Sequence, residues 1–192
     1  MIIYGTKKTL DIYRLKLPDQ FANPLMKHLI TDTRKRQAGD PLYEWGAKVF
    51  QFEYLKCLQL CNFASKFTIV IADVKEKQID QLTEIIFGYL NDIYSGDQEM
   101  LKLIDRYAAE NTVTYFDKLT DRSIISSMNY FQTSYMEDGD RFYDFVDGNL
   151  LRTRPLNKEI NWNYLAGLKV HGKKTYDYPA ERFAQLLKNR YQ

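Results

Sequence analysis

The sequence is poor in the residue types that usually mark a catalytic or metal site. Its 192 residues include only two histidines, two cysteines and nine glycines, and the glycines are scattered singly. No P-loop, dinucleotide-binding glycine pattern or Gly-x-Ser-x-Gly motif is present. His28 and His171 lack the partner spacing of a metal site. An enzymatic activity is therefore unsupported, and we expect neither a cofactor nor a metal.

One acidic stretch, Glu137-Asp138-Gly139-Asp140, suggests calcium binding by its composition but does not have the spacing of a calcium-binding loop. Counted from Asp138, Phe142 and Tyr143 occupy the fifth and sixth places, where an EF-hand loop needs an oxygen ligand and a glycine. We expect a solvated loop there. His28 falls on the apolar side of an expected helix, which favours a packed, hydrogen-bonded histidine, and His171 is expected in an exposed turn.

Long hydrophobic runs are also missing. The longest, at positions 67–72, has the length of a strand and is far shorter than the ~20 residues of a membrane helix. Ile2 and Ile3 are followed at once by polar and basic residues, so no secretory signal is expected. These absences predict a cytoplasmic protein without a membrane partner.

The two cysteines, Cys57 and Cys61, stand four residues apart in an expected strand. At ~3.3 Å per residue they lie ~13 Å apart, too far for a disulfide, which needs Cα atoms within ~7 Å. We expect two free, buried core thiols.

What is abundant is apolar and aromatic. Hydrophobic residues make up 45% of the chain, and it holds 15 tyrosines and 11 phenylalanines, enough for a sizeable core. The pattern predicts an α+β fold in which an antiparallel β-meander packs against several helices. We expect one domain over residues 1–150, followed by a basic C-terminal extension, 151–192, with a terminal helix packed on the same domain.

The meander is expected from three β-rich runs at 48–52, 57–61 and 67–71. The gaps between them are short, which favours antiparallel neighbours. A further strand is expected at positions 1–4, and positions 112–116 could add another to the meander.

Helices are expected where apolar residues recur every three or four positions or where capping residues stand. They are expected to start at Thr6, at Asn23-Pro24, near Ile79, at Asp97, at Thr120-Asp121 and at Pro179. Positions 148–178 show no sustained period.

Charge is distributed unevenly. Residues 1–40 carry a net charge of +4, residues 41–150 carry −8 and residues 151–192 carry +6. The termini either pack on an acidic body or bind an anionic partner, and we favour the first interpretation. The candidate contacts to an anionic partner are Arg34, Lys35, Arg36, Lys173 and Lys174. A basic run at a helix end, such as positions 34–36, is also explained as a solvated complement to the helix dipole.

Several segments together resemble a known but uncharacterised family. They are Met1-Ile2-Ile3-Tyr4, Thr6-Lys7-Lys8-Thr9-Leu10, Glu44-Trp45-Gly46-Ala47-Lys48, Lys56-Cys57 through Asn62-Phe63-Ala64-Ser65-Lys66-Phe67, and Lys118-Leu119-Thr120-Asp121-Arg122-Ser123 with Asn129. The resemblance covers about residues 1–150 and is to bacterial proteins, mainly Gram-positive, of a domain family of unknown function. Related versions occur at the N-terminus of plasmid- and transposon-associated proteins. The resemblance implies a bacterial or mobile-element setting and no established activity.

The polar residues within these segments form a candidate site. They lie at the ends of expected strands and helices, where binding sites are commonly built. They are Lys7, Lys8, Asn62, Ser65, Lys66, Asp121, Arg122 and Asn129. The alternative is that they cap helices and order turns.

Three functions remain open. The first is a non-enzymatic regulatory or protein-interaction module, favoured because no catalytic motif accompanies the many aromatic residues. The second is a nucleic-acid-binding protein that uses the basic groups near the termini. The third is an enzyme acting on an anionic small molecule held by Lys7, Lys66 and Arg122.

Overall fold

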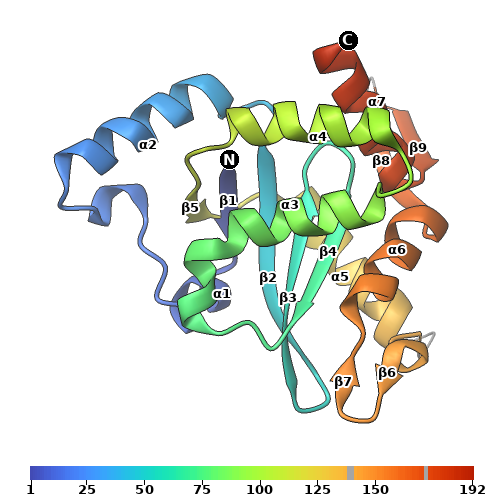
Figure 1. Cartoon of the computed structure of the whole chain (residues 1–192). Coiled ribbons are helices and arrows are strands. Elements are labelled where there is room, and N and C mark those ends of the chain that lie inside the picture. The colour runs from blue at the N-terminus through green and yellow to red at the C-terminus, as the bar shows by residue number, and fades with distance from the viewer. Residues whose placement is uncertain (138–140, 171–172) are drawn as a thin grey trace.

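A mixed five-stranded sheet forms the centre of the protein (Figure 1). The computed structural model describes residues 1–137, 141–170 and 173–192. The strand order is β4-β3-β2-β1-β5. The strands are β1 (Ile2–Gly5), β2 (Glu44–Phe52), β3 (Leu55–Asn62), β4 (Thr68–Ala72) and β5 (Tyr115–Lys118).

The α+β class and the β2-β3-β4 antiparallel meander are confirmed. The expectation of a purely antiparallel sheet is wrong, because β1 runs parallel to both β2 and β5. The long connection from Gly5 to Glu44 contains helices and can return the chain in the same direction, which a short turn cannot. The strand expected at 112–116 lies at 115–118, and it pairs with β1 instead of joining the meander.

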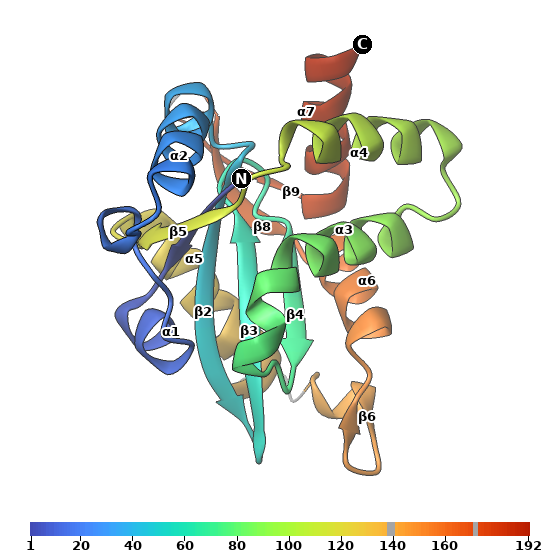
Figure 2. The same ribbon diagram turned by 60° about the vertical axis from the view of Figure 1, so that its left-hand side comes forward.

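Helices cover both faces and one edge of the sheet (Figures 1 and 2). They are α1 (Lys7–Ile12), α2 (Pro24–Gln37), α3 (Leu82–Ile93), α4 (Gln98–Glu110), α5 (Arg122–Gln132), α6 (Thr153–Asn163) and α7 (Pro179–Tyr191). Short turns of 3₁₀ helix occupy η1 (Pro18–Gln20), η2 (Glu76–Gln81) and η4 (Tyr143–Phe145), and a π-helical turn, η3 (Thr133–Glu137), follows α5.

The main core lies on the face covered by α3, α4 and α7 (Figure 1). Strand alternation points Trp45, Val49 and Leu60 to this face, where Trp45 meets Phe183 of α7 with 6.2 Å between ring centroids. Trp45 also donates a hydrogen bond through Nε1 to the hydroxyl of Tyr107, 3.1 Å away in α4. The opposite face carries α5, which Figure 1 shows behind the sheet.

Most of the expected helix starts are confirmed. Thr6 accepts from the Thr9 amide, Asn23 precedes Pro24, and Asp97 accepts from two amides of α4. The cap of α5 is one residue later than Thr120, since Asp121 Oδ1 accepts from the Ile124 amide at 2.9 Å.

Two other expectations need correction. His28 is not packed: α2 buries Ile30, Thr33 and Gln37, while the exposed His28 Nε2 lies 3.1 Å from Asp32 Oδ2. The segment 148–178 is more regular than its sequence suggests. It contains α6, the hairpin β8 (Ala166–Val170) and β9 (Lys173–Asp177), and β7 (Leu150–Leu151), which pairs with β6 (Val146–Asp147).

Helix α6 closes the β4 edge of the sheet with two buried asparagines. Asn157 accepts from the Val70 amide at 2.7 Å and donates to the Val70 carbonyl at 2.9 Å. Asn161 does the same at Thr68, at 2.8 and 2.7 Å. The two carboxamides therefore take the hydrogen-bonding place of a sixth strand.

Both cysteines are buried and free, as expected. No helix in the described ranges is long and apolar enough to cross a membrane. The same ranges contain no group of three metal-ligating side chains. The acidic stretch at 138–140 and His171 fall outside the described residues.

Candidate functional site

The turn between β3 and β4 is ordered by the side chain of Asn62. Its Oδ1 accepts from the amides of Ala64 and Ser65 at 3.2 and 3.1 Å and from Ser65 Oγ at 3.0 Å. Its Nδ2 donates to the Leu42 carbonyl at 2.9 Å. Ser65 Oγ in turn accepts from the Phe67 amide at 3.1 Å. Asn62 and Ser65 are both completely buried, so they hold the turn in place rather than face a ligand.

Lys66 stands at the tip of this turn in a backbone conformation that lysine rarely adopts, with φ at +61°. Its ammonium donates to the Phe63 carbonyl at 3.1 Å. Burial lowers the pKa of Lys66, and the Asp121 carboxylate and Cys61 partly oppose this shift. The turn thus presents a half-buried cation whose charged form is poorly solvated.

Helix α5 lies unusually close to the sheet beside this turn. Its inner side chains Ile124 and Met128 pack with Cys61 over Gly46 of β2. A Cβ atom at position 46 would lie 2.6 Å from Ile124 Cγ2, a distance that real Cβ atoms essentially never show, so any larger residue would displace α5. This close approach fixes the position of the helix relative to the β3–β4 turn.

The outer flank of α5 is polar and faces the turn. Arg122, in the first turn of the helix, begins this flank, and three serines and Tyr130 continue it at helical spacing. The flank residues that line a pocket with Lys66 are Arg122, Ser123, Ser126, Ser127 and Tyr130. Guanidinium, ammonium and hydroxyl groups are donors suited to an oxyanion such as a phosphate or carboxylate.

The remaining wall of the pocket is aromatic. Tyr164, at the end of α6, packs against Tyr135, Phe131 and Tyr130, with ring centroids 5.5, 6.1 and 6.3 Å apart. Burial raises the pKa of the Tyr164 hydroxyl, so it stays a neutral hydrogen-bonding group. Tyr176 of β9 and Phe63 of the turn complete this wall.

The pocket between the β3–β4 turn, α5 and the β8–β9 hairpin has a volume of about 750 Å³. Such a volume suits a small ligand. Its lining is mixed: two cations and three serine hydroxyls stand among several aromatic rings. This arrangement can bind a molecule that carries an anionic group next to a flat, partly apolar group.

The remaining members of the candidate polar site do not line this pocket. Asp121 is the cap of α5, as described above. Asn129 turns toward β2, where Lys48 Nζ donates to its Oδ1 at 2.6 Å. Lys7 and Lys8 are exposed in the first turn of α1 and line neither of the two main pockets. Lys66 and Arg122 are therefore the two candidates that meet in one pocket.

The candidate contacts to an anionic partner lie on two elements. Arg34, Lys35 and Arg36 form the last turn of α2, and Arg34 is already engaged in an ion pair with Asp117 of β5. Lys173 and Lys174 begin β9, the strand that brings Tyr176 to the pocket. No residue of α2 lines that pocket.

A family model for a domain of unknown function (DUF6933) matches residues 2–182. This match spans almost all of the chain. The chain belongs to this family. No curated protein matches the chain significantly.

In this DUF6933 chain, sequence reasoning identified Lys66 and Arg122 but missed the residues around them. Ser123, Ser127 and Tyr130 recur at intervals of three or four, a polar stripe that could have been found beside the apolar one. Tyr164 and Tyr176 offered no such signal, because neither lies in a segment with a clear period.

Proposed function

We propose that the protein is a non-enzymatic regulatory module that binds a small anionic ligand in the pocket between the β3–β4 turn, α5 and the β8–β9 hairpin. The observation that supports this most directly is that Lys66 and Arg122 line one pocket together with several aromatic rings. The cations would hold the anionic group, and the rings would hold a flat portion such as a nucleobase.

The backbone at Lys66 supports a ligand-binding role. Positions with φ near +60° are usually occupied by glycine or asparagine, which adopt this conformation at lower cost. A lysine there is strained, and its ammonium is also partly withdrawn from water. An anionic ligand would offset the cost of that burial, which is why we assign the position to binding.

Binding is favoured over catalysis by the chemistry of the lining. Among the described residues that line the pocket there is no aspartate, glutamate or histidine to serve as a general base for the serines. The enzyme hypothesis keeps one candidate, the Lys66 amine, because its lowered pKa would make it a better nucleophile. Recovery of the bound ligand chemically unchanged after prolonged incubation would separate the two functions.

The nucleic-acid hypothesis has less support. Arg34 is occupied by Asp117, and the last turn of α2 contributes no side chain to the pocket. Binding through the basic termini would also be lost steeply with rising salt, whereas a ligand held in a half-enclosed pocket would depend on salt less.

The cellular setting is part of the proposal. A bacterial cytoplasm and an association with mobile elements are inferred from the resemblance of the segments around Lys7, Lys66 and Arg122. A neighbouring transposase, toxin or defence gene would support this setting, and a consistent position in a biosynthetic operon would contradict it.

The pocket is tested by calorimetric titration of the full chain with AMP, GMP, CMP and UMP, with adenosine and with inorganic phosphate. We expect at least one nucleotide to bind more tightly than its nucleoside and than phosphate. Lys66→Asn keeps a residue suited to φ +61°, and we expect it and Arg122→Gln each to weaken binding about tenfold or more, as loss of a charge-assisted hydrogen bond implies.

Lys7→Asn is the matched control, because it removes an exposed lysine outside the pocket. It should bind like the unmodified chain. The proposal fails if none of the six compounds binds, or if Lys66→Asn and Lys7→Asn behave alike.

A further inference from the structure

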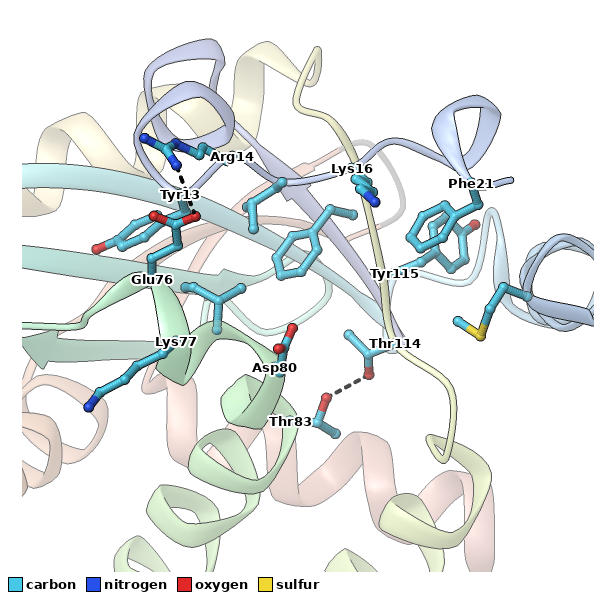
Figure 3. A pocket seen from close by; sticks show the side chains of 14 residues that line it. Tyr13, Arg14, Lys16, Phe21, Glu76, Lys77, Asp80, Thr83, Thr114 and Tyr115 are labelled. Atoms are coloured by element: carbon cyan, nitrogen blue, oxygen red, sulfur yellow. Dashed lines mark hydrogen bonds and ion pairs between the residues drawn. The ribbon is translucent and has the colours of Figure 1, made fainter. Parts of the chain in front are cut away.

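A second pocket, of about 720 Å³, lies beside β5 at the opposite end of the sheet from α6 (Figure 3). Its walls come from the segment after α1, from the end of η1 and the start of α2, from η2 and the start of α3, and from β5 with the residue before it. It shares no residue with the pocket around Lys66. Any role for it is thus independent of the function proposed above.

The pocket passes over the outer edge of β5. Three consecutive residues, Thr114, Tyr115 and Phe116, line it. Side chains alternate between the two faces of a sheet, so a cavity that touches all three must cross the edge of the strand. In Figure 3, Tyr115 lies on one side of the strand with Phe21, whereas Thr114 lies on the other and accepts a hydrogen bond from Thr83 at 2.7 Å.

The backbone of β5 offers unused hydrogen-bonding groups at this edge. The amides of Tyr115 and Leu119 donate to the carbonyls of Met1 and Gly5 at 3.3 and 2.9 Å, which directs the odd-numbered positions toward β1. The alternation of a parallel ladder then points the N–H and C=O of Phe116 outward, into the pocket. Within the described ranges, no other group is hydrogen-bonded to either.

The surroundings of this edge admit a single extended chain. Apolar side chains pack on both faces of β5: Leu15 and Ile79 belong to the main core with Phe116, and Phe21 packs in a separate cluster with Tyr115. The segment after α1 lines the cavity and η1 lies against β5, so the sheet of a second copy would meet this segment before it reached the edge. An extended segment could enter and place alternate side chains against the two apolar walls.

Charge further defines this occupant. Figure 3 shows the Asp80 carboxylate directed into the cavity, while Lys77 points away from it. Arg14, at the rim, lies 4.0 Å from Glu76 and is partly neutralised by it. Lys16 also lines the cavity, beside β5, so the preference for a basic side chain is confined to the part of the cavity around Asp80.

We propose that the edge of β5 binds a short extended peptide of a partner protein, which adds to the sheet as a sixth strand. The peptide pairs with the N–H and C=O of Phe116, places apolar residues on both sides of β5, and carries a lysine or arginine that meets Asp80. This is a protein-interaction site at the one sheet edge that α6 does not close.

The probe for this site is a set of peptides selected from a random 12-residue phage library on the immobilised full chain, then synthesised with blocked ends. Fluorescence anisotropy would measure their affinities, and hydrogen exchange would follow individual amides. We expect exchange of the Phe116 amide to slow at least tenfold on binding. Exchange of the Tyr115 amide, already bonded to Met1, should change little.

Backbone N-methylation separates strand addition from side-chain binding. Methylation of the peptide amide that donates to the Phe116 carbonyl should weaken binding about tenfold, and methylation one position away should have little effect. Asp80→Asn should weaken peptides with a basic residue several-fold. Asp105→Asn, which changes an exposed carboxylate of α4 outside both pockets, is the matched control.

Four results would overturn the proposal. They are the failure to select any peptide, binding that is insensitive to the position of methylation, an unchanged Phe116 amide, and a concentration-dependent dimer that protects the same amide. The last would assign the edge to a second copy of this chain.

Discussion

The two edges of the sheet are handled in opposite ways. At β4, two carboxamides from α6 satisfy the outward backbone groups of Thr68 and Val70. At β5, the outward groups of Phe116 face a cavity. One edge is closed from within the chain by buried side chains, and the other borders a cavity lined by both apolar and charged side chains. The difference fits the proposal that β5 binds a peptide, whereas the closure of β4 contributes to the stability of the fold.

Both edge strands are short. β5 has only four residues and ends in charged positions, which limits non-specific pairing. β4 has five residues, four of them buried, and without α6 it would pair with strands of other molecules far more readily. The two asparagines thus close the edge that would be the more prone to aggregation if it were open.

The largest effect is expected at the closed edge. Replacing Asn157 with leucine leaves the N–H and C=O of Val70 buried without partners, which should lower the free energy of unfolding by about 2–5 kcal/mol. The equivalent change at Asn161 should act similarly, and the double variant should not fold at 37 °C. Equilibrium urea denaturation measures the single variants.

Asn163→Leu is the control for these variants, because it lies on the same helix but is exposed. If Asn163→Leu lowered the free energy of unfolding as much as Asn157→Leu, the helix α6 itself would be disturbed. The loss at Asn157 would then not measure the closure of the β4 edge.

A smaller effect, dependent on pH, is expected on the β5 side. The buried α-amino group of Met1 donates to Gln37 Oε1 at 2.7 Å and to the carbonyl of Val113, just before β5, at 2.8 Å. Burial, with help from the nearby Arg36 charge, lowers the pKa of this amino group from 8.0 to about 5. Between those values the unfolded chain binds the extra proton, so stability should rise with pH, by about 1 kcal/mol per unit.

Urea midpoints measured from pH 5.5 to 7.5 would show this rise. An Asn157→Ala variant should be less stable throughout but keep the same slope, because carboxamides do not titrate. A flat profile in the unmodified chain would show that the amino group is not buried as described.

The smallest effect is expected at the ion pair between Arg34 and Asp117, which joins α2 to β5. Both side chains retain access to water, so Arg34→Ala should cost less than about 1 kcal/mol. The difference should shrink in 1 M salt. A larger loss of unfolding free energy would mean that the contact between α2 and β5 stabilises the fold more than an exposed ion pair can.

The sequence revealed the elements whose buried residues are apolar. The meander and α3 follow from alternation and from helical spacing that leucine and isoleucine make visible. Helix α6 was missed for a physical reason, because two of its four buried positions are Asn157 and Asn161, and buried asparagines interrupt the apolar period. The prediction that His28 is packed was wrong for the same reason, because the polar residues Thr33 and Gln37 occupy buried positions of α2.

Pairings between distant segments were beyond the reach of local patterns. The parallel register of β1 with β5 depends on how helices return the chain, and no local signal specifies it. Lys66 and Arg122 were each noticed as polar residues at the end of an element. Their place in one pocket depends on Gly46, which lets α5 approach the sheet.

The closure of β4 also has a consequence for the order of events during synthesis. Val70 and Asn157 are 87 residues apart in the chain. At about 5–20 residues per second, a ribosome needs roughly 4–17 seconds to produce the second after the first. Throughout that interval the nascent sheet has an uncovered edge, so the polysome, more than the finished protein, is where this chain is most exposed to aggregation.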